Sequence, residues 1–390
     1  MLDVVFSMGW LDPSFWQKVV QGFNRQQRGQ IRVTYRNFKP DRYLDELRRM
    51  FSGTGRRIDV IGGDVIWPAE FASKGWIADL SSRFAPSERQ QFLPGTIQAN
   101  TFQGKVWGVP WFTDVGLLFY RKDLLGSGLS APQTWNELKQ RALQVKQNSG
   151  IQHGHVFQGA QNESGVCSGL EYIWSHGGEV LDLQDSSRVI IDSPQTVAGL
   201  TTERSMITEG VSPQSVDSYD VWESWDEFLS GRSVFCRNWP GLYESVGGQG
   251  SALNRDQVEV VPIPAGTGGQ SAGCFGGWNL FINAASDAAH QDAAWQFIQF
   301  MTDAKTQKER AVNNVLLPTR QALYQDPDVQ QVKIIPMAKA ALDKARTRPA
   351  HPRYSEMSAA MAEQFNRCLK GQVTPAQAAQ TLQAQLSNIV

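Results

Sequence analysis

The sequence predicts an α/β protein of two domains, and three observations support this fold class. The chain has 390 residues, which is longer than a single hydrophobic core usually supports, so two domains are expected. Residues 1–85 alternate strand-like and helix-like segments, which indicates a mostly parallel sheet covered by helices. No long linker divides the chain, so we expect it to cross between the domains several times, as in a hinged protein.

The N-terminal elements follow from hydrophobic periodicity and from capping residues. Aspartate followed by proline is typical of a helix start, and Asp12-Pro13 precedes apolar residues at helical spacing. The expected elements are a strand at residues 3–8, a helix after Asp12-Pro13, a strand at 31–35, a helix at 43–51 and a strand at 58–63. The last strand ends in glycines directly before Asp64, at the strand end where α/β sheets bind ligands.

The remainder of the chain is richer in helices. Thr134 and Glu137 form a capping-box pattern that opens a helix reaching about residue 148. Residues 151–283 mix helices with short strands. Further helices are expected at 286–302, where Ala293, Ala294, Phe297, Ile298 and Met301 form one apolar stripe, at 328–346, at 355–369, and after Thr374-Pro375.

Composition and charge exclude several classes of protein. The chain is 41% hydrophobic and 19% charged, as in ordinary globular proteins, and its net charge of −1 gives no field that attracts nucleic acid or an anionic membrane. No apolar run reaches the roughly 18–20 residues of a membrane span. The first residues enter a strand pattern without a leader, which leaves a cytosolic protein or an exported protein whose signal has been removed.

We expect neither a metal nor a cofactor. The cysteines are Cys167, Cys236, Cys274 and Cys368. Their spacing shows no zinc pattern, so we expect buried free thiols, with one disulfide between Cys236 and Cys274 as the alternative. No dinucleotide-binding, phosphate-loop or serine-nucleophile motif occurs, which weakens most enzyme hypotheses without excluding a glycosidase.

Residues 104–125 indicate the kind of ligand. This apolar, β-rich segment holds Trp111, Phe112 and one carboxylate, Asp114. Carbohydrates offer apolar C–H faces and many hydroxyl groups, so an aromatic pair beside an acid suits a polyhydroxylated ligand. Asp64 is a second candidate acid, with a turn or helix-capping role before residues 68–73 as the alternative.

Four further side chains are candidate ligand contacts. Trp239 precedes a proline at a strand end, and Trp278 follows a glycine pair ending in Gly277, which lets backbone or ligand approach closely. Core packing is the alternative for both tryptophans. Arg348 lies beside a proline-marked loop and either aims its guanidinium at a ligand or lies on the surface, and Glu163 faces ligand or solvent.

Several ordered blocks give the chain a resemblance to the extracellular solute-binding proteins of sugar ABC importers, above all the trehalose/maltose-binding ones. The blocks are residues 59–67, 71–76, 104–125, 159–178, 235–240, 276–278 and 348–349. The resemblance implies the type II periplasmic-binding-protein fold, with two α/β lobes joined by a multi-crossing hinge and a ligand cleft between them. Lobe one is expected at 1–112 and 283–319, and lobe two at 113–282 and 320–390.

The resemblance also implies ligand contacts. They are carboxylates at Asp64 and Asp114, stacking platforms at Trp239 and Trp278, a close backbone contact at Gly277, and a second-lobe donor at Arg348. Phe112 matches an aromatic position that is often tyrosine, and Asp12 or Trp10 substitutes for a glutamate that some relatives carry. Both departures lie where they would alter which sugar is preferred.

The implied function is sugar capture for an ABC importer. A monomeric, exported receptor, in the periplasm or at the cell surface and with lipid anchoring as one option, would bind a disaccharide or small α-glucoside by hinge closure and deliver it to the permease subunits. Trehalose is the first choice, and maltose, sucrose or glucosylglycerol follows.

Two other classes stay open at this stage. A glycoside hydrolase would use Asp64 and Asp114 as its acid pair, at a fixed separation across the scissile bond. A receptor for a peptide or a polyamine is the second, although the guanidinium of Arg348 argues against a cationic ligand.

Overall fold

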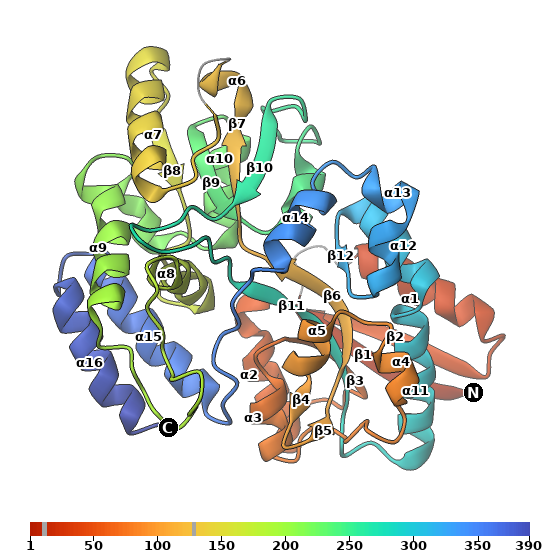
Figure 1. Cartoon of the computed structure of the whole chain (residues 1–390). Helices are drawn as coiled ribbons and strands as arrows, with labels where there is room; N and C mark the ends of the chain where they lie inside the picture. Colours follow the sequence, from red (N-terminus) through yellow and green to blue (C-terminus); the bar gives the residue numbers. More distant parts are fainter. Residues whose placement is uncertain (10–13, 127–129) are drawn as a thin grey trace. The chain divides into compact units, whose positions relative to one another are not determined.

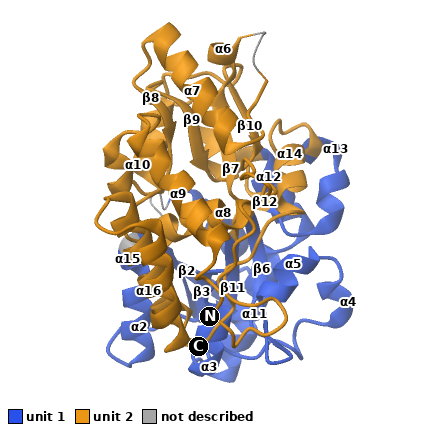
Figure 2. Ribbon diagram, turned by 60° about the vertical axis from the view of Figure 1, so that its left-hand side comes forward, with its two compact units in different colours: residues 1–113, 277–312, 318–329 blue, residues 114–276, 313–317, 330–390 orange. Residues whose placement is uncertain are grey.

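The computed structural model describes residues 1–9, 14–126 and 130–390. Within these ranges the chain divides into two compact units (Figure 2). Unit 1 comprises residues 1–113, 277–312 and 318–329, and unit 2 comprises 114–276, 313–317 and 330–390. From the sequence, we expect the chain to return to lobe one at residue 283. In the structure, unit 1 resumes at residue 277.

A six-stranded sheet runs through the described part of unit 1 in the order β12-β6-β11-β3-β1-β2 (Figure 1). Its strands are β1 (Leu2–Gly9), β2 (Ile31–Phe38), β3 (Val60–Asp64), β6 (Val109–Val115), β11 (Phe275–Ile282) and β12 (Leu317–Pro318). β1 pairs in parallel with β2 and β3, as the alternation of strands and helices predicts, whereas β3 and β11 are antiparallel. The sheet is mixed because β11 enters from unit 2 and not through a helical crossover.

The remaining elements of unit 1 are helices and short strands. They are α1 (Ser14–Gln26), α2 (Pro40–Phe51), α3 (Pro68–Ser73), α4 (Pro86–Arg89), α5 (Pro94–Ala99), β4 (Thr101–Phe102), β5 (Lys105–Val106), α11 (Ala288–Met301), α12 (Ala304–Asn314), η3 (Gln321–Gln325) and α13 (Pro327–Gln330). Proline stands in the first turn of α2, α3 and α5, where its missing N–H leaves no helical bond unmade. α11 buries the five residues of the predicted apolar stripe.

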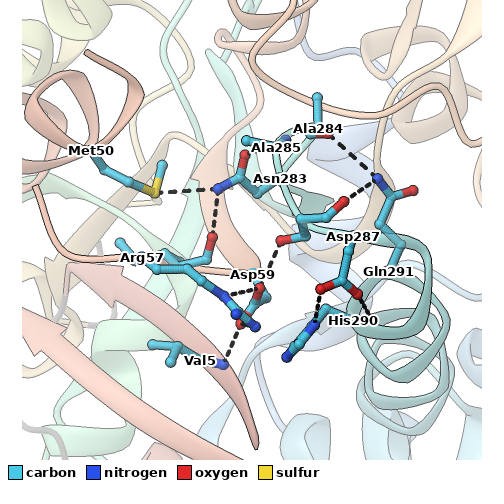
Figure 3. Close-up of polar contacts among 12 residues, drawn as sticks. Val5, Met50, Arg57, Asp59, Asn283, Ala284, Ala285, Asp287, His290 and Gln291 are labelled. Atoms are coloured by element: carbon cyan, nitrogen blue, oxygen red, sulfur yellow. Dashed lines mark hydrogen bonds and ion pairs between the residues drawn. The ribbon is translucent and has the colours of Figure 1, made fainter. Parts of the chain in front are cut away.

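A buried carboxylate, Asp59, lies directly before β3 and fixes the start of this strand (Figure 3). Asp59 is fully buried and accepts the backbone N–H of Val5 at 2.9 Å and the hydroxyl of Ser286 at 2.6 Å. The guanidinium of Arg57 donates to both of its oxygens, at 2.8 and 3.0 Å. Charge-assisted bonds of this kind are strong, and they tie β3 to β1 and to the segment before α11.

Unit 2 contains a second sheet, and its described strands follow the order β10-β7-β9-β8. The strands are β7 (Leu117–Arg121), β8 (His153–Val156), β9 (Ser233–Asn238) and β10 (Val258–Pro262), and β9 is parallel to β8 but antiparallel to β7. The other elements are α6 (Lys122–Leu125), α7 (Trp135–Ser149), α8 (Glu163–Ser175), α9 (Pro194–Thr208), η1 (Gln214–Ser218), α10 (Val221–Leu229), η2 (Pro240–Ser245), α14 (Ile335–Leu342), α15 (Tyr354–Leu369) and α16 (Pro375–Ser387). α8 is buried along most of its length and packs against α9 and α15.

Gly116 separates β6 from β7 within the segment 104–125. A Cβ atom at this position would overlap Oε1 of Glu171 and would lie 2.6 Å from Nη2 of Arg237. The backbone N–H of Gly116 also donates to the carbonyl of Cys274 at 3.1 Å. Only glycine therefore fits where the chain enters unit 2.

Residues 328–346 do not form the single helix that the sequence predicts. α13 ends at Gln330 and α14 covers Ile335–Leu342. Pro336 is the physical reason, because it has no N–H to donate to the carbonyl of Val332 and its ring would clash there. The helix therefore restarts, with this proline in its first turn.

All four cysteines are buried free thiols. The alternative of a disulfide between Cys236 and Cys274 is wrong, because the two sulfurs lie against different backbone groups. Sγ of Cys236 lies 3.5 Å from the carbonyls of Ser224 and Arg237, whereas Sγ of Cys274 lies 3.6 Å from the carbonyl of Phe275.

Glu203 on α9 makes the stability of unit 2 depend on pH. Its side chain is 1% exposed, and burial raises its pKa from 4.5 to about 8. Between these values the folded protein holds a proton that the unfolded chain has released, so stability falls as pH rises through this window. We expect Glu203→Gln to abolish this loss of stability and, at about 1.4 kcal/mol per pKa unit, to exceed the parent protein in stability by up to about 5 kcal/mol at about pH 9, with no gain near pH 4.

Denaturant-induced unfolding at both pH values measures this effect. Glu209→Gln is the matched control, because Glu209 caps the same helix, is largely solvent-exposed and pairs with Lys139 at 2.8 Å. If Glu203→Gln and the parent protein lose stability equally as pH rises, Glu203 is not held protonated in the fold.

Candidate functional site

In unit 1 the structure brings Asp64 and Trp278 together. Asp64 ends β3, and Trp278 on β11 is its direct partner in the antiparallel register. One oxygen of Asp64 accepts the backbone N–H of Ile66 at 3.2 Å, and the N–H of Val65 donates to the carbonyl of Gly277 at 3.2 Å. The φ of Gly277 is +124°, a conformation that only glycine adopts readily, so the residue before Trp278 cannot carry a side chain without strain.

The indole of Trp278 is supported from within unit 1 and remains partly exposed. Its ring stacks on Tyr43 with the centroids 6.3 Å apart and meets Trp67 edge-on at 6.1 Å. Such aromatic contacts hold a ring in one orientation. Unit 1 thus presents a fixed aromatic surface beside a partly exposed carboxylate, Asp64.

Phe112 lies in a buried aromatic cluster of unit 1. Its residue exposure is 4%, its ring meets Trp111 at 5.3 Å, and it is parallel to the ring of Trp16 at 6.4 Å. The ring therefore serves the packing of β6 against α1. Trp111, the other aromatic residue of this sequence block, is 3% exposed and lies edge-on to Phe6 at 5.7 Å.

In unit 2 a second acid and a second tryptophan come together around Gly276. A Cβ atom on Gly276 would lie 3.3 Å from Cβ of Asp114 and 3.0 Å from Cζ3 of Trp239. A side chain at Gly276 would therefore crowd the indole of Trp239 and the side chain of Asp114. Asp114 and Trp239 are both partly exposed, so unit 2 also places a carboxylate near an accessible aromatic ring.

Behind Trp239 lies a buried ion pair that the sequence analysis did not find. Glu171 on α8 and Arg237 on β9 have side chains that are 1% and 2% exposed, and two hydrogen bonds of 2.6 and 2.8 Å join them. Burial lowers and the Glu171 carboxylate raises the pKa of Arg237, and the net shift is upward. Glu171 also accepts the N–H of Cys274 at 2.8 Å.

The signal for this ion pair was present in the sequence. Each charge stands alone in an apolar stretch, Glu171 between Leu170 and Tyr172 and Arg237 two residues after Phe235. A charged residue within an otherwise buried segment requires a partner of opposite charge. Its partner is nonetheless set by tertiary structure, since the two residues are far apart in sequence.

Arg348 and Glu163 contact each other within unit 2. The guanidinium of Arg348 is 2% exposed and donates to Oε1 of Glu163 at 2.6 Å and to the carbonyl of Phe275 at 3.4 Å. Glu163 also accepts the hydroxyls of Tyr354, at 2.7 Å, and Ser358. Burial and this carboxylate raise the pKa of Tyr354, so its hydroxyl keeps the proton that it donates.

Two predicted site residues, Trp10 and Asp12, lie outside the described residues. In the ranges that the structure does describe, no group of three histidine, cysteine or acidic side chains is arranged to hold a metal ion. Across the same ranges, the helices are too short or too polar to span a membrane.

Two α/β units that exchange the chain at several points, each with a tryptophan near a carboxylate, define a two-lobed solute-binding protein. Residues 10–308 match the family described as bacterial extracellular solute-binding protein. The chain belongs to this family, and the resemblance to extracellular solute-binding proteins that the sequence blocks carry is confirmed. The expected fold class, a bilobal α/β fold of the type II periplasmic-binding-protein kind, is also confirmed by the solved structures that the chain matches.

Three relatives illustrate the similarity. The "Probable ABC transporter-binding protein" of Deinococcus radiodurans is 33% identical, with 85% of this chain and 80% of the relative aligned. The structure of "Maltose bound T. maritima MalE3" has a TM-score of 0.93 and 34% identity and covers 100% of both chains. The GacH receptor of Streptomyces glaucescens, solved unliganded and with acarbose, has a TM-score of 0.88 and 26% identity and covers 99% of this chain and 98% of the receptor.

Gly276→Ala tests the packing around Trp239. The new methyl group lies closer to the indole and to Asp114 than ordinary contacts allow, so the ring must move. We expect the free energy of unfolding to fall by about 1–3 kcal/mol, together with a change in tryptophan emission. Chemical denaturation followed by fluorescence measures both quantities.

Gly22→Ala is the control for this substitution. Gly22 lies inside α1, and the nearest atom to a Cβ there is 3.8 Å away, so this change should raise stability by up to about 1 kcal/mol. Unchanged stability and emission in Gly276→Ala would contradict the described contact.

Proposed function

We propose that this protein is the substrate-binding component of an ABC importer for a sugar, and that its ligand is a disaccharide or small α-glucoside. The observation that carries the proposal is the pairing of a partly exposed tryptophan with a nearby carboxylate in each unit: Trp278 with Asp64, and Trp239 with Asp114. The similarity to a maltose-bound and an acarbose-bound receptor supports a carbohydrate ligand.

The chemistry of these pairs suits sugar rings. An indole offers a flat apolar surface to the C–H face of a pyranose, and a carboxylate accepts hydrogen bonds from its hydroxyl groups. Two aromatic surfaces and two acids fit a ligand of two rings better than a single small polyol. Trehalose remains the first choice, ahead of maltose, sucrose and glucosylglycerol.

In the proposed mechanism the ligand binds groups from both lobes and thereby stabilises a hinge-closed state. The permease subunits of the importer would recognise that state on an exported monomer, at the cell surface or in the periplasm. A micromolar dissociation constant corresponds to about 8 kcal/mol, which stacking and charge-assisted hydrogen bonds are able to supply after the costs of ordering.

The other predicted contacts have different roles in the proposal. Gly277 contributes a backbone approach beside Trp278, and Arg348 is a donor whose guanidinium Glu163 already orients. Phe112 contributes through packing and not through direct contact, because it is buried against Trp16. Trp10 and Asp12 complete the proposed set.

Trp278→Ala is expected to weaken sugar binding at least about a hundredfold, equivalent to about 2.8 kcal/mol, because it removes one stacking surface. The ligand would first be identified by thermal shift with a panel of glycosides and then titrated by calorimetry. Circular dichroism would verify that the variant is folded.

Trp295→Ala is the matched control. Trp295 is likewise a partly exposed tryptophan of unit 1, but it lies on α11 and its ring is 6.2 Å from that of Phe84, whereas Trp278 lies on β11 opposite Asp64. The affinity of the Trp295→Ala variant for sugar should equal that of the parent protein. Unchanged affinity in Trp278→Ala would refute the stacking role, and hydrolysis of a bound disaccharide would replace the receptor proposal with the glycosidase.

A further inference from the structure

The guanidinium of Arg237 lies against the indole of Trp239. Its central carbon is 4.1 Å from the ring centroid, and its side chain is 2% exposed, so water does not compete for the contact. Arginine stacks on tryptophan through both its charge and its flat shape, and such contacts strengthen when they are removed from water. Trp239 itself remains partly exposed, so Arg237 covers only part of the ring.

Three hydrogen bonds fix the plane of this guanidinium. Nε donates to Oε2 of Glu171 at 2.8 Å, and Nη2 donates to Oε1 of the same carboxylate at 2.6 Å. Nη1 donates to Oε1 of Gln158 at 3.1 Å. Gln158 is held in turn, because its Nε2 donates to the carbonyl of Arg237 at 2.8 Å and to Ser224 at 2.7 Å.

The indole also packs against Gly276, where a Cβ atom would lie 3.0 Å from Cζ3 and 3.4 Å from Cη2 of the ring. The guanidinium on the face of the ring and the Gly276 backbone at its edge restrict how Trp239 tilts. The side chain of Asp114 packs near the same glycine. The orientation of the Trp239 ring therefore also sets where the ring lies relative to Asp114.

We propose that Arg237 is a positioning residue that, fixed by Glu171 and Gln158, holds Trp239 as a preformed stacking surface for a sugar. This inference rests on the proposed function. Arg237, Glu171 and Gln158 would act without touching the ligand themselves. A rigid surface lowers the ordering cost of binding. A cation already on the ring also weakens its attraction for a second one, so the surface suits an uncharged ligand.

Two variants separate the parts of this arrangement. Arg237→Lys keeps the positive charge that Glu171 requires but removes the flat guanidinium and its fork of donors. Glu171→Gln with Arg237→Met removes both charges together, keeps an oxygen for the N–H of Cys274, and avoids leaving one buried charge unpaired. If the neutral pair does not fold, Arg237→Lys still provides the test.

The control applies the same changes to a different ion pair in unit 2. Glu227 and Arg232 form a doubly hydrogen-bonded pair, at 2.7 and 3.0 Å, and the Arg232 side chain is 42% exposed. Glu227→Gln with Arg232→Met should leave Trp239 and sugar affinity unchanged.

Fluorine NMR of protein labelled with fluorotryptophan reports on Trp239 directly, and its resonance is assigned by its loss in Trp239→Phe. We expect this resonance to shift, broaden or split in both Arg237 variants and the dissociation constant for the sugar to rise about tenfold, while the control keeps both values. A Trp239 resonance and an affinity that match the parent protein would overturn the inference. If the parent protein binds no sugar, the proposed function fails, while the resonance alone still decides whether Arg237 positions Trp239.

Discussion

The ion pair between Glu171 and Arg237 is the interaction on which the proposed binding region of unit 2 depends. Both charges are almost fully withdrawn from water, which costs several kcal/mol per ion unless the geometry is close and the other polar atoms are satisfied. The protein meets both conditions with two direct bonds and with further bonds to Gln158 and Cys274. Removal of one partner alone would leave a buried charge unpaired, at a cost of about 3–5 kcal/mol.

This pair explains features that look unrelated in the sequence. Gly116 has no side chain because the carboxylate and guanidinium fill that space, and the chain enters unit 2 there. The strand that becomes β11 is tied to the same carboxylate through Cys274, just before it leaves for unit 1. The same guanidinium lies over the ring of Trp239, with its central carbon 4.1 Å from the ring centroid. One buried interaction therefore sets the position of two crossing strands and of one candidate stacking surface.

Much of the fold could be predicted from the sequence, and the misses have physical reasons. The stripe of α11, the proline at the start of α3 and the strand before Asp64 are all local signals, which involve residues close in the chain. The prediction of one helix at 328–346 was wrong because a single proline, Pro336, outweighs the helical pattern around it. Among candidate site residues, Asp64 and Trp278 are adjacent in the sheet, whereas Phe112 lies in a packed aromatic cluster.

The sequence by itself determined the class of this protein: strand–helix alternation indicates two α/β domains, and the ordered sequence blocks resemble those of the extracellular solute-binding proteins. Only the tertiary structure decided which residues meet. It paired Trp278 with Asp64 through an antiparallel register, oriented Glu163 onto Arg348, and joined Glu171 to Arg237. The reason is that hydrophobic periodicity and capping act within a few residues along the chain, whereas register and ion pairing depend on how distant segments pack.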